Sequence, residues 1–209
     1  MKKMMFNDRY GLTQAVISGR KTVTRRIIDP QGKYEKLRWW QPCLEFEECL
    51  YGYTENEGWE VIEPRYNVGE IVAVAQRYDS FLHPNNGVIE HDYQTTALAS
   101  KGWDNKMFVK ADLMPHQIQI RDLRIERLRD ISDDECLNEG IFVNEYINKG
   151  KMRYHYGFDG FLHEREGWFA RKWFNTPREA FASLIDKVSG KGTWDRNPFV
   201  WRIEFQLVK

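Results

Sequence analysis

Apolar residues recur at helical spacing in three segments of the chain, and each segment carries signals for a helix end. The first segment is 8–18, which is followed by Gly19 at the position of a C-terminal glycine. The second is 132–140, which opens with a Ser-x-x-Glu capping box. The third is 176–188, in which a threonine precedes Pro177 at the first helical position. The sequence therefore predicts three helices, of which the middle one is short.

Alternation of apolar and polar residues predicts three strands. Segment 199–208 alternates along its whole length, which is typical of a half-buried strand with one apolar face. Segments 70–74 and 117–128 predict two further strands. In 117–128 the alternation slips by one residue near Arg121–Asp122, which indicates a bulge or a strong bend. Such bends allow a sheet to curl into a small closed barrel.

Two long stretches, 31–67 and 144–175, are rich in aromatic and charged residues but only weakly periodic. We interpret them as ordered loops or insertions on the barrel. Aromatic side chains of this kind can stack on nucleic-acid bases, but they more often fasten an insertion to a core. The tryptophans in question are Trp39, Trp40, Trp59, Trp168 and Trp173.

The composition predicts one folded domain over residues 1–209 that contains both insertions. Of the 209 residues 42% are apolar, which excludes a disordered chain. Basic and acidic residues number 31 each, so a tail-like polycation is excluded while a local basic patch remains possible. Three cysteines favour a reducing compartment, and no apolar run reaches signal-peptide or membrane-spanning length. We therefore expect a cytoplasmic location and no membrane partner.

A basic segment directly follows the first predicted helix. It places four cations within seven residues and two threonine hydroxyls between them. Arginine and lysine suit phosphate, and a glycine at positive φ would bring the backbone close to a ligand. The segment predicts a small anion-binding loop, although a solvated turn is the alternative interpretation. Its residues are Gly19, Arg20, Lys21, Thr22, Thr24, Arg25 and Arg26.

This segment resembles the Gly-x-Lys-x-x-Thr-x-Arg signature of ASCH domains. The matching residues are Gly19, Lys21, Thr24 and Arg26. Shorter resemblances to phage-type and bacterial members follow at 66–71, 125–132, 139–141, 177–181 and 197–201. The resemblance implies an α+β fold, namely a small PUA-like β-barrel with flanking helices and a cleft beside the basic loop.

The resemblance also implies an RNA or nucleotide ligand, because family members are generally thought to bind these molecules. Some small members resemble amidohydrolases of acylated cytidine, and others have been proposed as ribonucleases. In the amidohydrolases the residues matched by Lys21 and Thr24 act with a glutamate after the next strand. This chain has Gln76 at that place. A glutamine amide cannot take a proton as a general base.

The leading hypothesis is an RNA- or nucleotide-binding module. In it Lys21, Arg25 and Arg26 contact phosphate, and Gly19, Arg20 and Thr22 complete the ligand-binding loop. A base pocket would be lined by Thr24 and Gln76 and closed by Tyr78, which would stack on the base.

Two other functions remain open at this point. One is a hydrolase of acylated cytidine nucleosides or a ribonuclease, with Lys21 and Thr24 as catalytic residues. The other is a protein-interaction module that uses the aromatic insertions, with an unknown partner. We expect no cofactor and no metal, because the spacing of the cysteines and histidines fits no standard zinc site. Those residues are Cys43, Cys49, His83 and His91.

Overall fold

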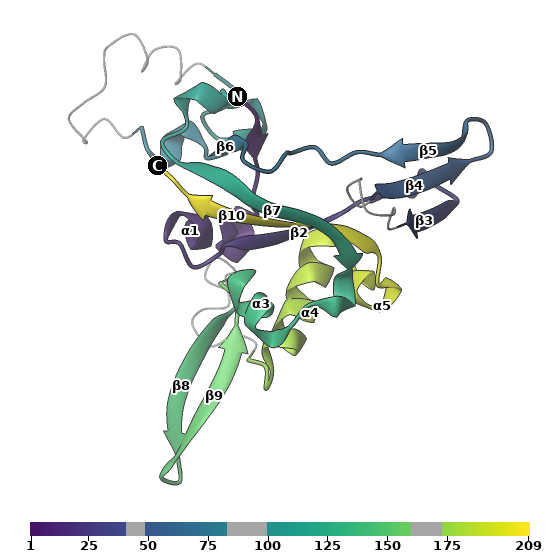
Figure 1. The fold of residues 1–209 in the computed structure, drawn as a ribbon. Coiled ribbons are helices and arrows are strands. Elements are labelled where there is room, and N and C mark those ends of the chain that lie inside the picture. Colours follow the sequence, from purple (N-terminus) through teal and green to yellow (C-terminus); the bar gives the residue numbers. More distant parts are fainter. Residues whose placement is uncertain (41–48, 83–99, 160–172) are drawn as a thin grey trace.

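The computed structural model describes residues 1–40, 49–82, 100–159 and 173–209 (Figure 1). Its centre is a five-stranded sheet with the strand order β1-β6-β7-β10-β2. β1 pairs with β6 in parallel, and the other neighbours are antiparallel. The strands are β1 (Lys3–Met4), β2 (Val23–Ile27), β6 (Ile71–Val74), β7 (Gln117–Arg127) and β10 (Phe199–Leu207).

The α+β class predicted from the sequence is confirmed, but the closed barrel is not. Within the described ranges β1 and β2 are the two outer strands of an open sheet, and no closed barrel is found. The predicted bulge is confirmed, because Glu204 pairs with Asp122 while Phe205 pairs with Ile120. Arg121 is therefore the extra residue in β7.

Helical segments pack on both faces of this sheet, because Ala73 of β6 shares a cluster with Tyr78 while its neighbours Val72 and Val74 belong to the core cluster of Phe181. The α-helices are α1 (Leu12–Ile17), α3 (Asp133–Asn138), α4 (Pro177–Ser189) and α5 (Thr193–Arg196). Short 3-10 helices are η1 (Asp8–Tyr10), η2 (Tyr78–Ser80), η3 (Lys106–Phe108), η4 (Ala111–Leu113) and η5 (Leu128–Asp130). No helix in the described part of the chain is long and apolar enough to cross a membrane.

The first predicted helix, 8–18, is divided in two by a glycine. Gly11 has a left-handed φ of 63°, and it separates η1 from α1. Asn7 caps η1, because its side chain accepts a hydrogen bond from the Arg9 amide. Gly19 does adopt a positive φ, of 74°, as the sequence predicts.

The other two predicted helices form as expected. Ser132 and Glu135 make the capping box of α3. The Thr176 hydroxyl accepts a hydrogen bond from the Glu179 amide at the start of α4. The buried face of α4 belongs to the core cluster that also contains β10 residues such as Val200. Its members on the helix are Ala180, Phe181, Leu184 and Ile185.

β10 is more deeply buried than a strand with one apolar face. Val200 lies in the core cluster and Arg202 is covered by ion pairs, so most positions on both faces are shielded from solvent. The predicted strand itself is confirmed over Phe199–Leu207.

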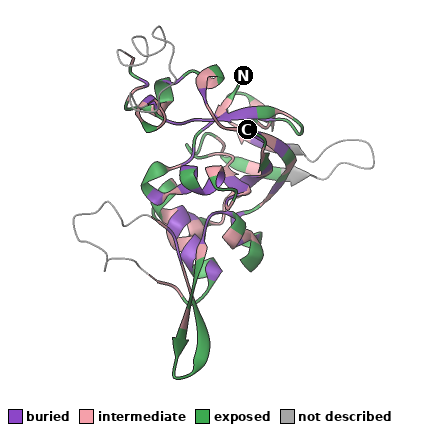
Figure 2. Cartoon of the chain, turned by 90° about the vertical axis from the view of Figure 1, so that its left-hand side faces the viewer, coloured by how far each residue is buried: buried purple, intermediate pink, exposed green. Residues whose placement is uncertain are grey.

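The described parts of both insertions contain strands that their weak periodicity did not predict. Residues of 31–67 form a separate antiparallel sheet of β3 (Lys36–Trp40), β4 (Cys49–Thr54) and β5 (Gly58–Ile62). The hairpin of β8 (Phe142–Asn148) and β9 (Lys151–Gly157) turns at two residues of positive φ, Lys149 and Gly150. Figure 2 shows that much of this hairpin is exposed.

One insertion tryptophan fastens its hairpin, as the sequence suggests. The ring of Trp173 meets Phe142 edge-on at 5.7 Å and stacks near His155 at 6.0 Å, both measured between ring centroids. Trp168, Cys43, His83 and His91 lie outside the described residues. The described residues contain no cluster of three or more potential metal ligands.

Candidate functional site

The second half of the basic segment is a strand rather than a loop. After α1 the chain turns at Gly19, and the Lys21 amide donates to the Ala15 carbonyl at 2.8 Å. The Thr22 amide donates to the Asn138 carbonyl at 2.9 Å, which ties this turn to the end of α3. From Val23 the segment continues as β2 along one edge of the sheet.

Lys21 is one of the most deeply buried large side chains in the described structure, with 2% of its surface exposed. Its ammonium group donates to the Val23 carbonyl at 2.7 Å, the Glu139 carbonyl at 2.7 Å and Glu139 Oε2 at 2.5 Å. An ammonium group has three N–H donors, so all of them are used. Burial lowers the pKa of Lys21, and the charge and hydrogen bond of Glu139 offset that effect only in part.

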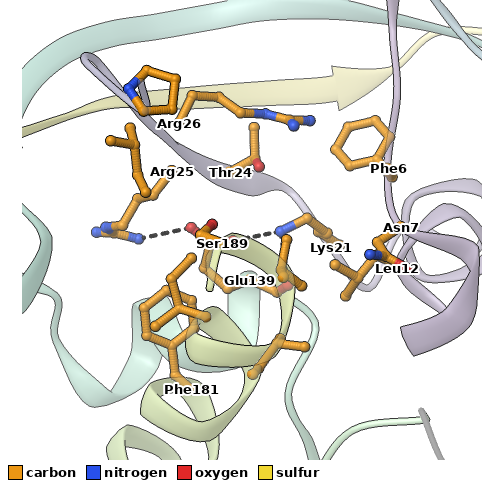
Figure 3. Close-up of a pocket in the computed structure, with 15 residues that line it drawn as sticks. Phe6, Asn7, Leu12, Lys21, Thr24, Arg25, Arg26, Glu139, Phe181 and Ser189 are labelled. Carbon is orange, nitrogen blue, oxygen red and sulfur yellow. Dashed lines mark hydrogen bonds and ion pairs between the residues drawn. The ribbon is translucent and has the colours of Figure 1, made fainter. Parts of the chain in front are cut away.

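Arg25 forms the centre of a second set of ion pairs on the same strand. Its side chain is fully buried and contacts three carboxylates, at 2.6 Å to Glu126, 2.8 Å to Glu135 and 3.2 Å to Glu139. Figure 3 shows the Glu139 carboxylate between Arg25 and Lys21. Arg202 of β10 joins the network through Glu135 at 2.7 Å. We call this set of paired side chains the ion-pair network.

A cavity of about 350 Å³ lies beside the start of β2 (Figure 3). One wall is polar and comes from the basic segment and Glu139, and the opposite wall is apolar and comes from α1, α4 and Phe6. The lining residues are Phe6, Asn7, Leu12, Lys21, Thr24, Arg25, Arg26, Ile27, Pro30, Glu139, Phe181, Leu184, Ile185, Val188 and Ser189. We call it the first cavity.

Two polar groups of the first cavity lack the partners that Lys21 and Arg25 have. Thr24 is a buried residue, but its hydroxyl oxygen keeps access to the cavity and makes no side-chain hydrogen bond with a described residue. Arg26 is half-buried and donates from Nη2 to the Met5 carbonyl at 2.6 Å, with its guanidinium 5.5 Å from the Phe6 ring centroid. In the described ranges Arg26 forms no ion pair with a carboxylate. Burial is the main reason why the pKa of Arg26 is lowered.

The outer edge of β2, beside this cavity, carries backbone groups without a strand partner among the described residues. The Ile28 amide donates to Phe199, and the Phe205 amide donates to Thr22. The backbone N–H and C=O groups of the even-numbered residues of β2 therefore pair with β10. The same backbone groups of the odd-numbered residues face the opposite direction. The N–H and C=O groups of Arg25 and Ile27 thus face the outer edge, where no described residue pairs with them.

Several predicted site residues lie away from the first cavity. Arg20 donates to the Gly140 carbonyl and lies 3.4 Å from Asp159, and Thr22 does not line the cavity. Gln76 is buried and its Oε1 lies 2.7 Å from His116 Nδ1. Tyr78 belongs to a separate hydrophobic cluster, and its hydroxyl accepts from the Lys110 amide at 2.9 Å. The described structure therefore does not bring Gln76 or Tyr78 to the cavity of Lys21 and Thr24.

Glu139 is the site residue that the sequence analysis missed. It lies at the end of α3, 118 positions from its partner Lys21. Helix-end signals explain Gly140 but say nothing about the carboxylate before it. Only the demand that a buried ammonium group must meet an acid could have pointed to such a residue.

Comparison of the chain with known proteins finds no matching family model, no matching curated protein and no matching solved structure. The resemblance therefore stays a prediction from short motifs, and the first cavity with its Thr24 and Arg26 groups is the starting point for a function.

Proposed function

We propose that this chain binds a nucleoside or nucleotide unit, such as one residue of an RNA strand, in the first cavity. The observation that carries the proposal is a pair of polar groups, the Thr24 hydroxyl and the Arg26 guanidinium, which face a concave site without a full set of partners. A volume of about 350 Å³ lies within the range of small-ligand sites. The proposal retains the ASCH resemblance and its PUA-like architecture as an expectation.

The roles of the cations differ from those expected from the sequence. Lys21 and Arg25 already satisfy buried carboxylates, so a phosphate would have to compete with Glu139 for them. Arg26 has no such competitor among the described residues, and it becomes the phosphate contact. An anion beside a partly desolvated guanidinium forms a strong, charge-assisted hydrogen bond.

The remaining walls suit a nucleobase and its sugar. Among the α4 side chains that line the cavity, Val188 is exposed and offers apolar surface to a base. The Thr24 hydroxyl and the unpaired N–H and C=O groups of Arg25 can donate to and accept from a base edge. Gln76 and Tyr78 take no part in this proposal.

The first prediction concerns binding of nucleoside 5′-monophosphates to Arg26→Met and Thr24→Val. Arg26→Met should weaken binding by roughly 10- to 100-fold, because a charge-assisted hydrogen bond is lost. Thr24→Val should weaken binding by roughly 3- to 10-fold, because it keeps the side-chain shape but removes one neutral hydrogen bond. Isothermal titration calorimetry at two salt concentrations would measure both effects.

Arg153→Met is the matched control, since Arg153 is exposed on β9 and does not line the first cavity. Thermal unfolding of each variant would check that the fold is retained. If all four monophosphates fail to bind, or if they bind the two site variants as tightly as the unchanged protein, the proposed function is wrong.

A hydrolase is the second candidate, and the contact between Lys21 and Glu139 is the observation that favours it. Glu139 supplies the carboxylate that Gln76 cannot, directly beside the predicted catalytic pair Lys21 and Thr24. Water would attack the acyl carbon of an acylated cytidine while Glu139 takes its proton. The Lys21 ammonium would protonate the departing cytidine amine, and the proton on Glu139 would then return to Lys21 along their hydrogen bond.

The second prediction tests this reaction by incubating the protein with N4-acylated cytidine and, separately, with labelled RNA. If the hydrolase candidate holds, Glu139→Gln should lower turnover at least about 100-fold, because a general base is removed. Glu135→Gln is the control, since Glu135 also contacts Arg25 but does not line the first cavity. Absence of product from the unchanged protein would exclude the hydrolase while leaving the binding proposal in place.

A further inference from the structure

A second cavity, of about 430 Å³, adjoins the first. Arg26, Ile27 and Pro30 line both cavities, so the end of β2 and the residues after it form a shared wall. The second cavity has its floor on the sheet, where Trp201 and Ile203 of β10 lie beside Leu123 of β7.

The polar groups of the second cavity differ in their availability. The Lys3 ammonium donates to the carbonyls of Met107 and Val109, each at 2.7 Å, and is therefore largely satisfied. The Tyr66 hydroxyl donates to the Lys3 carbonyl at 3.0 Å. Arg65 is exposed, lies 5.6 Å from the Tyr66 ring centroid, and forms no ion pair with a carboxylate in the described residues. Glu63 is the acidic residue of this lining.

Arg26 stands between two spaces that are each of small-ligand size. Only Nη2 of its guanidinium has a hydrogen-bond acceptor among the described residues, so further N–H donors remain for a ligand. A cation at the junction of two such cavities suits a ligand that has an anionic link between two larger groups. A phosphodiester between two nucleosides has this chemistry.

We propose that the two cavities are adjacent subsites for a single-stranded oligonucleotide of at least two residues. The linking phosphate lies at Arg26, and the second base lies in the cavity of Tyr66, Trp201 and Arg65. This inference rests on the proposed function, and it changes the ligand from a mononucleotide to a strand. The aromatic rings supply contact area for the base, and Arg65 lies near the next phosphate along the strand.

The third prediction compares the four nucleoside 5′-monophosphates with the sixteen dinucleotides, in ribose and deoxyribose forms. At least one dinucleotide should bind roughly 5- to 100-fold more tightly than either of its monophosphates, because a second base contact is gained. Arg65→Glu should remove most of that gain, because the second subsite loses a cation. Arg153→Glu, an exposed arginine outside both cavities, is the matched control.

The outcomes separate this inference from the proposed function. If monophosphates bind and respond to Arg26→Met, but dinucleotides bind no more tightly, the second subsite is refuted and the first stands. If Arg65→Glu and Arg153→Glu weaken dinucleotide binding equally, the gain comes from general charge and the second subsite is again refuted. If neither the monophosphates nor the dinucleotides bind, both proposals are overturned. A preference for the ribose or the deoxyribose set identifies the source of the strand.

Discussion

Replacing Arg25 by methionine is expected to lower the free energy of unfolding by about 3–5 kcal/mol, because it leaves buried carboxylates without their cation. The Arg25 side chain is fully buried and contacts Glu126, Glu135 and Glu139. Methionine has a similar length and no charge, so the loss reflects the missing ion pairs more than a cavity. Chemical denaturation at neutral pH would measure the change.

Arg124→Met is the matched control, because Arg124 contacts two of the same carboxylates from the solvent side. Its side chain is 49% exposed and lies 3.5 Å from Glu126 and 3.4 Å from Glu135. An exposed ion pair contributes about 0–1 kcal/mol, so this variant should remain close to the unchanged protein. Equal losses from Arg25→Met and Arg124→Met would contradict the role assigned to burial.

Acid provides a second readout of the same network. Burial alone would raise the pKa of Glu135, but the hydrogen bond from Arg202 and the charge of Arg25 outweigh it and hold the pKa below 4.5. Because the folded pKa lies below the unfolded one, this carboxylate stabilises the fold above the unfolded pKa. That stabilisation is lost as the pH falls through the folded pKa. Arg25→Met removes one cause of the shift, so its stability should depend less steeply on pH in this acidic range.

Replacing Lys21 by methionine should also be strongly destabilising, by about 3–5 kcal/mol. Glu139 would keep only the longer contact to Arg25, at 3.2 Å, and the carbonyls of Val23 and Glu139 would each lose a buried donor. The free energy of unfolding from denaturant titration would measure the loss. A ligand-binding role for Lys21 alone predicts no such loss.

The double variant Lys21→Met with Glu139→Gln separates the ion pair from side-chain packing. Removing both charges should recover part of the stability lost in Lys21→Met, because no buried carboxylate then lacks its lysine. A double variant that is as unstable as the sum of its single variants would show that the two side chains do not interact. Such additivity would contradict the close contact between them.

Local signals were sufficient for the elements that depend on neighbouring residues. Ser132 and Thr176 cap α3 and α4 because their hydroxyls meet amides three residues away. The bulge at Arg121 was also visible locally, because one extra residue in a strand reverses the faces of the side chains that follow it. The alternation in 117–128 slips at that position. The division of segment 8–18 was missed because Gly11 interrupts a pattern that its neighbours otherwise continue.

The site was predicted in part. Composition and motif placed Lys21, Thr24, Arg25 and Arg26 together, and all four do line one cavity. Their state could not be foreseen, because Arg25 and Lys21 meet acids more than 100 positions away. Gln76 was placed by analogy with a family position, and its partner in the structure is His116.

The pairing of charges in the ion-pair network also determines how an anionic ligand arrives. Opposite charges a few ångströms apart cancel at a distance, so most cations of the basic segment contribute little long-range potential. Encounter with a polyanion would then proceed without electrostatic acceleration, at the slower rates typical of uncharged partners. Discrimination between ligands would consequently depend on how well they fit after contact rather than on how fast they are captured.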